Sequence, residues 1–219
     1  LRASGPKPGA STNFATRAVH APPTLDGIGN TSCNCKARLV LFRHGSRAGL
    51  WHDPPMQGVD HYENFPVASW LCPPRLRAPI AALYHYARTA DDIADEGDAV
   101  ATQRLADLAA YRAELGRALA GLQPADARWT GVFDALARAI QAHQLPAQPL
   151  HDLLDAFEQD VRHTAEDRRY TDQAELLDYC RRSADPVGRL LLHLYGVQEE
   201  RLLRQSDAIC SALQLINFW

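Results

Sequence analysis

The densest group of chemically useful side chains in this sequence lies between residues 84 and 96. It reads Tyr-His-Tyr-Ala-Arg-Thr-Ala-Asp-Asp-Ile-Ala-Asp-Glu. Residues three or four positions apart share one face of a helix, and this spacing places Asp91 and Asp95 together. Tyr84 and Arg88 extend the same face by two turns. The stretch therefore predicts a helix that presents two carboxylates, a guanidinium and a phenol on one side.

The carboxylates of this helix are unfavourable without a partner. Asp91 and Asp95 repel each other, and Gly97 is expected to end the helix, so the acidic residues crowd the negative end of its dipole. A divalent cation reverses that cost, and carboxylate oxygens suit Mg²⁺ that bridges to a substrate phosphate. The alternative is a solvated acidic helix end in which Arg88 offsets part of the charge. The motif alone does not decide between the two.

The elements that would position these groups are helices. Long segments with apolar residues at helical spacing run over about 75–97, 100–121, 127–144, 149–164, 173–195 and 199–218. Glycine or proline separates them, at Gly97, Pro124, Pro146 and Gly196. Pro186 lies inside the fifth segment and is expected to kink it. The pattern predicts an all-α fold, a helical bundle.

Composition bounds the class of protein. The chain has 219 residues, of which 46% are hydrophobic and 22% charged, as is ordinary for one soluble globular domain. No apolar run reaches the roughly 18 residues that a membrane span needs. The five cysteines are an odd and scattered set, which argues against a disulfide framework. A cytoplasmic location is predicted.

The leading segment, residues 1–55, differs from the rest of the chain. It holds seven basic residues against two acidic ones, whereas the remainder holds 16 basic and 24 acidic residues. Six prolines interrupt it, and no helical periodicity is sustained. We expect it to be disordered or non-native. Met56 is the single methionine, and our hypothesis is that it is the true start of a domain over 56–219.

Three segments carry a resemblance to a known family. They read Asn-Phe-Pro-Val-Ala-Ser-Trp-Leu at 64–71, which leads into the acidic motif, then Ala-Glu-Leu-Leu-Asp-Tyr-Cys-Arg-Arg-Ser-Ala-Asp-Pro-Val-Gly-Arg at 174–189, and Leu-Gln-Leu-Ile-Asn-Phe-Trp at 213–219. Over roughly residues 60–219 the chain resembles the squalene/phytoene synthase family. Within that family it is most similar to the bacterial hydroxysqualene synthases of the HpnC type, which act in hopanoid biosynthesis.

The resemblance implies a fold, a cofactor and a site. The fold would be an isoprenoid-synthase-like helical bundle around a central cavity, and the cofactor Mg²⁺. By residue, it implies metal ligands at Asp91, Asp95 and Asn217, catalytic groups at Arg88, Tyr84 and Tyr179, and substrate contacts at Phe65, Gln214 and Asn217. The implied reaction turns presqualene diphosphate and water into hydroxysqualene and diphosphate by metal-assisted ionisation.

Other members of the family remain alternatives for the activity. Phytoene synthase and presqualene diphosphate synthase fit the same motifs, and so does a non-catalytic fragment. The sequence stops at Trp219, before the acidic residues of the second family motif, so this polypeptide alone is expected to be inactive. Expected partners are a prenyl diphosphate, the surface of the inner membrane and neighbouring hopanoid-pathway enzymes, with no nucleic acid.

Two details depart from the family pattern. Asp185 stands where Asn is expected beside the kink, and the stretch 164–170 looks longer than in relatives. Two short motifs lie outside the resemblance. The stretch Leu-Val-Leu-Phe-Arg-His-Gly-Ser-Arg resembles the opening of a histidine phosphatase with His44 as nucleophile, but helices follow where an α/β sheet is required. Cys33 and Cys35 lack the spacing of a zinc site.

Overall fold

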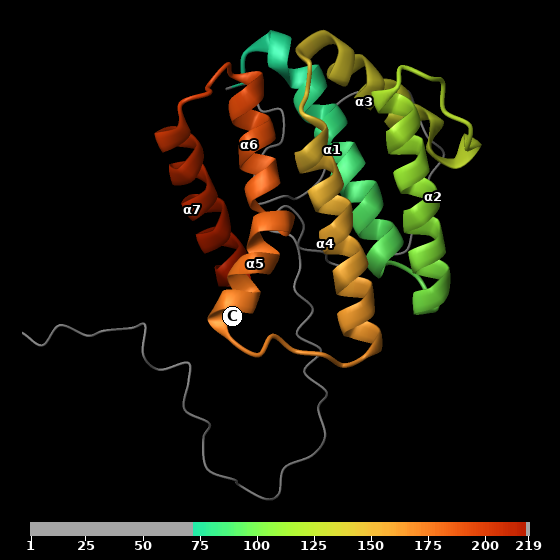
Figure 1. Ribbon diagram of the computed structural model, residues 1–219. Helices are drawn as coiled ribbons and strands as arrows, with labels where there is room; N and C mark the ends of the chain where they lie inside the picture. The colour runs from blue at the N-terminus through green and yellow to red at the C-terminus, as the bar shows by residue number, and fades with distance from the viewer. Residues whose placement is uncertain (1–71, 218–219) are drawn as a thin grey trace, which may run out of the picture. The chain divides into compact units, whose positions relative to one another are not determined.

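The computed structural model describes residues 72–217, and over these residues every regular element is a helix. The elements, shown in Figure 1, are α1 (Pro74–Asp95), α2 (Ala101–Leu119), the short 3₁₀ helix η2 (Ala127–Trp129), α3 (Thr130–His143), α4 (Ala147–Ala165), α5 (Gln173–Ser183), α6 (Asp185–Leu194) and α7 (Glu200–Asn217). None of these helices has the length and apolar content of a membrane span. The all-α prediction is confirmed.

Several sequence predictions fall outside these residues. The proposed boundary after residue 55, the substrate contact Phe65, and the motifs at His44, Cys33 and Cys35 all lie before residue 72. They stay predictions.

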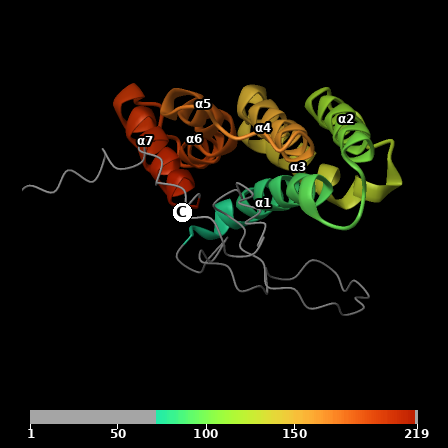
Figure 2. The ribbon, with the colours of Figure 1, turned by 90° about the horizontal axis from the view of Figure 1, so that it is seen from below.

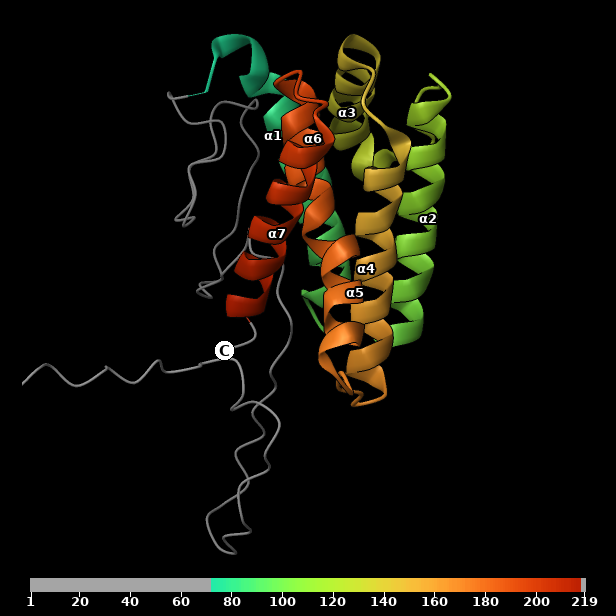
Figure 3. The ribbon, with the colours of Figure 1, turned by 60° about the vertical axis from the view of Figure 1, so that its left-hand side comes forward.

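The helices form two layers. Figure 2 shows α2, α4, the α5–α6 pair and α7 in a row, with α1 lying along one side of it. Helix α1 packs against α2, α3 and α4, while α7 packs mainly against α5 and α6. Figure 3 shows α7 running beside α6 and α5 at the edge of the row. Helix α1, which carries the acidic motif, is therefore the inner element and α7 the outer one.

Aromatic side chains hold α1 in this inner place. The rings of Tyr86 and Tyr111 stack at 5.6 Å between centroids, and Phe133 lies 4.7 Å from Tyr111. The Tyr86 hydroxyl donates to the carbonyl of Leu150 at 2.8 Å, and the Tyr111 hydroxyl donates to the carbonyl of Tyr86 at 3.0 Å. Because each buried phenol has an acceptor, the centre joins α1 to α2, α3 and α4 without an unpaired polar group.

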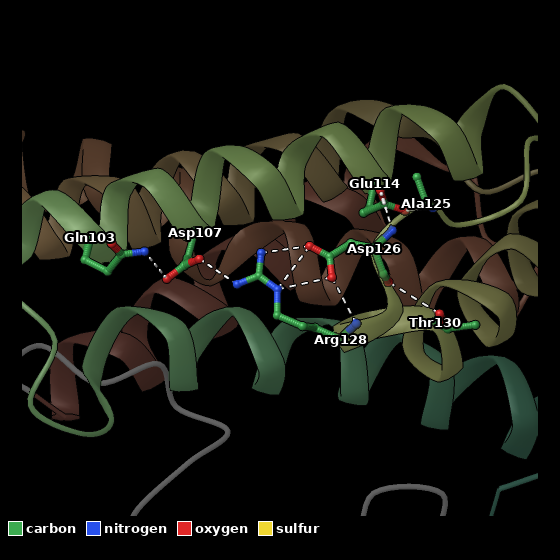
Figure 4. Close-up of polar contacts among 7 residues, drawn as sticks. All are labelled: Gln103, Asp107, Glu114, Ala125, Asp126, Arg128 and Thr130. Carbon is green, nitrogen blue, oxygen red and sulfur yellow. Dashed lines mark hydrogen bonds and ion pairs between the residues drawn. The ribbon is translucent and has the colours of Figure 1, made fainter.

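A buried carboxylate fixes the connection between α2 and α3. Glu114 is 5% exposed, and its two oxygens accept hydrogen bonds from the backbone N–H groups of Ala125 at 2.9 Å and Asp126 at 3.3 Å. At the surface of the same turn, Arg128 bonds Asp126 and reaches Asp107 at 2.7 Å, as Figure 4 shows. The turn is therefore held from inside and from outside.

Removing the inner contact should destabilise the fold. Glu114→Ala leaves two N–H groups without their acceptor, and we expect the free energy of unfolding to fall by about 2–4 kcal/mol. Urea unfolding followed by circular dichroism measures this change. Glu200→Ala, which alters a carboxylate whose side chain is 68% exposed, serves as the control and should change stability by less than about 0.5 kcal/mol. Equal midpoints for the two variants would contradict the role of Glu114.

The expected kink at Pro186 is a full break between two helices. Helix α5 ends at Ser183 and α6 begins at Asp185, which places Pro186 in the first turn of α6. Proline is tolerated there because that turn has no intrahelical acceptor for its N–H. The helix is thus interrupted at Ala184, two residues before the proline at which the sequence predicts a kink.

Close packing follows the break, between α6 and α7. A Cβ atom at Gly188 would lie against the Ser206 hydroxyl and 2.7 Å from the sulfur of Cys210, so a larger residue here would force these side chains of α7 to move. Asp185 is buried, accepts a hydrogen bond from the Ser211 hydroxyl at 2.9 Å, and has its pKa raised to about 6 by burial. The outer face of α7 differs, because every exposed residue from Ala208 to Ile216 is apolar. One face of helix α7 thus packs against α5 and α6, and its opposite, apolar face is exposed to solvent.

Candidate active site

The acidic motif occupies the last two turns of α1. The helix ends at Asp95, and Gly97 follows with a positive φ of 72°, a conformation that favours glycine. The predicted helix end is therefore confirmed. The last turn holds no basic residue, so the carboxylates of Asp91 and Asp95 face the negative end of the dipole without a cation in that turn.

Arg88 is the counter-ion of this group. Its guanidinium lies 3.1 Å from Asp91 and 2.7 Å from Asp92, with Glu96 further away at 3.8 Å. The arginine side chain is 20% exposed. Arg88 and Asp91 therefore share one face of α1, as predicted. The ion pairs of Arg88 also offset part of the negative charge, as the alternative of a solvated acidic helix end requires.

A half-buried carboxyl group on α4 is subject to the charges of the motif. Asp160 accepts a hydrogen bond from the hydroxyl of Tyr179, on α5, at 2.7 Å. Burial raises the pKa of Asp160 to about 8, and the negative charges of Asp91 and Asp95 raise it further despite the bond from Tyr179. The Asp160 and Tyr179 pair thus joins α4 to α5, and the charges of Asp91 and Asp95 act on Asp160 from α1.

Asp160 was not among the residues predicted from the sequence. The sequence does contain a pattern that could have indicated Asp160. Leu153, Phe157 and Asp160 have the spacing of one helical face, and the first two are buried. A carboxylate on the apolar stripe of a helix either has a buried partner or serves a site. Here it has a buried partner, Tyr179.

The remaining predicted residues are placed as follows. Tyr84 is buried on α1, one turn before Arg88, with its ring edge against His85. Gln214 is completely buried on α7. Asn217 closes α7, and its side chain is not described. The structure thus places Arg88, Asp91 and Asp95 in the last turns of α1, Tyr179 on α5 and the two amides on α7.

The acidic motif offers Mg²⁺ only part of a complete set of ligands. Among residues 72–217 no three His, Cys, Asp or Glu side chains are arranged to hold an ion. Mg²⁺ is usually bound through one or two carboxylates, with water and substrate phosphates completing its shell. The crowded carboxylates of Asp91 and Asp95 fit an ion that arrives with a phosphate. They do not form a cage of protein ligands.

Comparisons with known proteins agree with one another. The sequence profile of the squalene/phytoene synthase family matches residues 59–219. The hydroxysqualene synthase of Rhodopseudomonas palustris is 41% identical over 156 residues, and the presqualene diphosphate synthase of the same organism is 30% identical over 161. The crystal structure of squalene synthase HpnC from Alicyclobacillus acidocaldarius aligns with a TM-score of 0.60 at 40% identity.

These matches cover most of this chain but only part of the relatives. The two Rhodopseudomonas proteins match 71% and 74% of the chain, and the chain spans 49% and 54% of their lengths. The Alicyclobacillus structure covers 72% of the chain, which spans 55% of that protein. The chain therefore spans about half the length of the relatives it matches.

Proposed function

Because this chain belongs to the squalene/phytoene synthase family, we propose that it supplies the acidic motif of a hydroxysqualene synthase. That enzyme converts presqualene diphosphate and water into hydroxysqualene and diphosphate. The observation that carries the choice is the difference in identity to two proteins of one organism, 41% to its hydroxysqualene synthase against 30% to its presqualene diphosphate synthase.

We assign the residues the roles that the family resemblance implies for them. Asp91 and Asp95, with Asn217 from α7, would hold Mg²⁺ together with the diphosphate, and the bound ion would supply neutralisation of the leaving group. Arg88 would exchange part of its ion pairing with Asp91 and Asp92 for the phosphate oxygens. Tyr84, one turn away on α1, would lie beside the same end of the substrate.

The reaction also needs a polar group beside the carbocation. The carbon–oxygen bond to diphosphate breaks, a water oxygen bonds to the rearranged cation, and that water loses one proton. The Asp160 and Tyr179 pair joins α4 to α5, and burial keeps the Asp160 carboxyl protonated up to about pH 8, so the pair is suited to hold the water by hydrogen bonds. Phe65 is proposed to line the cavity that holds the prenyl chain, and Gln214 to face the diphosphate. Peripheral association with the inner membrane stays a prediction.

The activity is tested with a chimera, since the chain spans about half of its relatives. Residues 56–219 are joined to the portion of the Alicyclobacillus enzyme that has no counterpart here, and the product is analysed after incubation with presqualene diphosphate and Mg²⁺. We expect hydroxysqualene, and no product when Asp91 and Asp95 are both changed to Ala.

Other outcomes separate the alternatives. Presqualene diphosphate formed from farnesyl diphosphate, or phytoene formed from geranylgeranyl diphosphate, would assign the chain to those synthases. A folded chimera that converts none of the three substrates would instead support a non-catalytic fragment.

A further inference from the structure

A polar groove lies on the side of α4 that faces α5 and the connection between them. It has a volume of about 500 Å³, and Gln159, His163 and Arg182 are among its lining residues. None of the residues of the acidic motif lines the groove. Its arginines form ion pairs with acidic residues that also line it, for example Arg182 with Asp178 at 2.8 Å. It brings solvent close to the layer of aromatic residues behind it.

Three aromatic rings lead from this groove to Asp160. His163 lies 5.3 Å from the ring of Tyr170, and Tyr170 lies 5.4 Å from the ring of Tyr179, whose hydroxyl donates to Asp160. The Gln159 side-chain amide also donates to the Tyr170 hydroxyl, at 3.4 Å. Tyr170 is thus the middle ring, with one contact toward solvent and one toward the buried pair.

The backbone around Tyr170 is fixed on both sides. Arg168 bonds Glu175 at 2.6 Å, and the same carboxylate accepts hydrogen bonds from the Thr171 backbone at 2.8 Å and its hydroxyl at 2.9 Å. Asp172 caps α5 by accepting from the Glu175 backbone N–H at 2.8 Å. The connection is therefore tied to the first turn of α5, two turns before Tyr179.

We propose that Tyr170 is a positioning residue, whose ring holds Tyr179 in the orientation that keeps the Tyr179 hydroxyl on Asp160. A phenol has two side-chain torsions, so the place of its hydroxyl depends on what packs against the ring. Tyr170 provides that surface and is itself held by Gln159 and His163. The inference rests on the proposed function, which gives the Asp160 and Tyr179 pair its role.

The orientation of the Tyr179 hydroxyl can be tested in the polypeptide of residues 1–219, without substrate. Tyrosine is labelled with ¹³C at Cζ, and the signal of Tyr179 is assigned by its loss in Tyr179→Phe. Donation of the hydroxyl to the Asp160 carboxyl group moves this signal downfield. Tyr170→Leu should therefore move it upfield, toward that of a phenol in water. Tyr170→Phe keeps the ring and should leave the signal in place.

A matched control separates positioning from general packing. Tyr195→Leu makes the same substitution at a tyrosine that is 46% exposed, and the Tyr179 signal should not move. The proposal is overturned if Tyr170→Leu leaves the Tyr179 signal unchanged. It is equally overturned if the signals of Tyr86 and Tyr111 move as far as that of Tyr179, since a general loosening would then explain the effect.

The active chimera supplies a second readout. Tyr170→Leu is expected to lower kcat about tenfold with KM nearly unchanged, and Tyr170→Phe to restore most of the rate. A change confined to KM would contradict positioning of the pair. If the chimera makes no product while the Tyr179 signal responds as described, the proposed function fails and the positioning role stands.

Discussion

Asp91→Asn is expected to weaken the binding of Mg²⁺ and inorganic diphosphate to this chain on the order of a hundredfold. The substitution takes one charged oxygen donor from an ion that has few protein ligands. Titration calorimetry with diphosphate in the presence and absence of Mg²⁺ measures the affinity. The midpoint of thermal unfolding should rise with the two ligands for the unmodified chain and stay constant for the variant.

The metal-free variant should be nearly as stable as the unmodified chain. Asp91→Asn relieves the repulsion from Asp95 but loses the ion pair with Arg88, and the two changes offset each other to within about 0.5 kcal/mol. Asp98→Asn, at an exposed position just after α1, is the control and should keep the ligand response. If both variants bind diphosphate and Mg²⁺ as the unmodified chain does, the acidic group is only a solvated helix end.

Asp160→Asn should make the metal-free protein more stable, by an amount that grows with pH. The pKa of Asp160 is raised to about 8 in the folded protein, whereas a carboxyl of the unfolded chain titrates near about 4. Between these values the folded state keeps a proton that the unfolded state has lost. The unmodified protein therefore loses stability as pH rises through this window, and the full loss is reached above about pH 8.

Asparagine has no charge to bury, and its carbonyl oxygen still accepts a bond from Tyr179. The gain over the unmodified chain should be close to zero near about pH 4 and reach about 2–4 kcal/mol above pH 8. Urea unfolding at several pH values tests this difference, with Asp98→Asn as the control that should follow the unmodified chain throughout. A constant difference at all pH values would show that the raised pKa of Asp160 is not the cause.

The helices of this protein were predictable because their apolar spacing is regular and glycine or proline stands between them. The first predicted segment, 75–97, corresponds to Pro74–Asp95, and the last, 199–218, to Glu200–Asn217. The segment 173–195 was predicted as one helix but contains two. The apolar periodicity continues across Ala184, whereas the α-helix is interrupted there. A pattern of side chains reports which residues face the core and says less about where the hydrogen-bond ladder stops.

The site was less predictable than the fold, for a different reason. Arg88 and Asp91 lie on one helix, so their contact follows from local geometry. Asp160 and Tyr179 meet across α4 and α5, and nothing in the spacing along either helix specifies that pairing. The sequence could have marked Asp160 as a charge on an apolar stripe, but its partner and its distance from the acidic motif depend on how α4 packs against α1.

The bare outer face of α7 has a consequence for how firmly the two halves of the proposed site are held. Amide hydrogen exchange should be slowest around Tyr86 and Tyr111, where α1 is enclosed on several sides, and faster along α7, which is attached by one face only. Asp91 and Asp95 then lie on the helix that unfolds locally least often, α1, whereas Gln214 lies on a helix that unfolds locally more often, α7. A ligand that bridges α1 and α7 would therefore slow exchange in the outer helix far more than in the inner one.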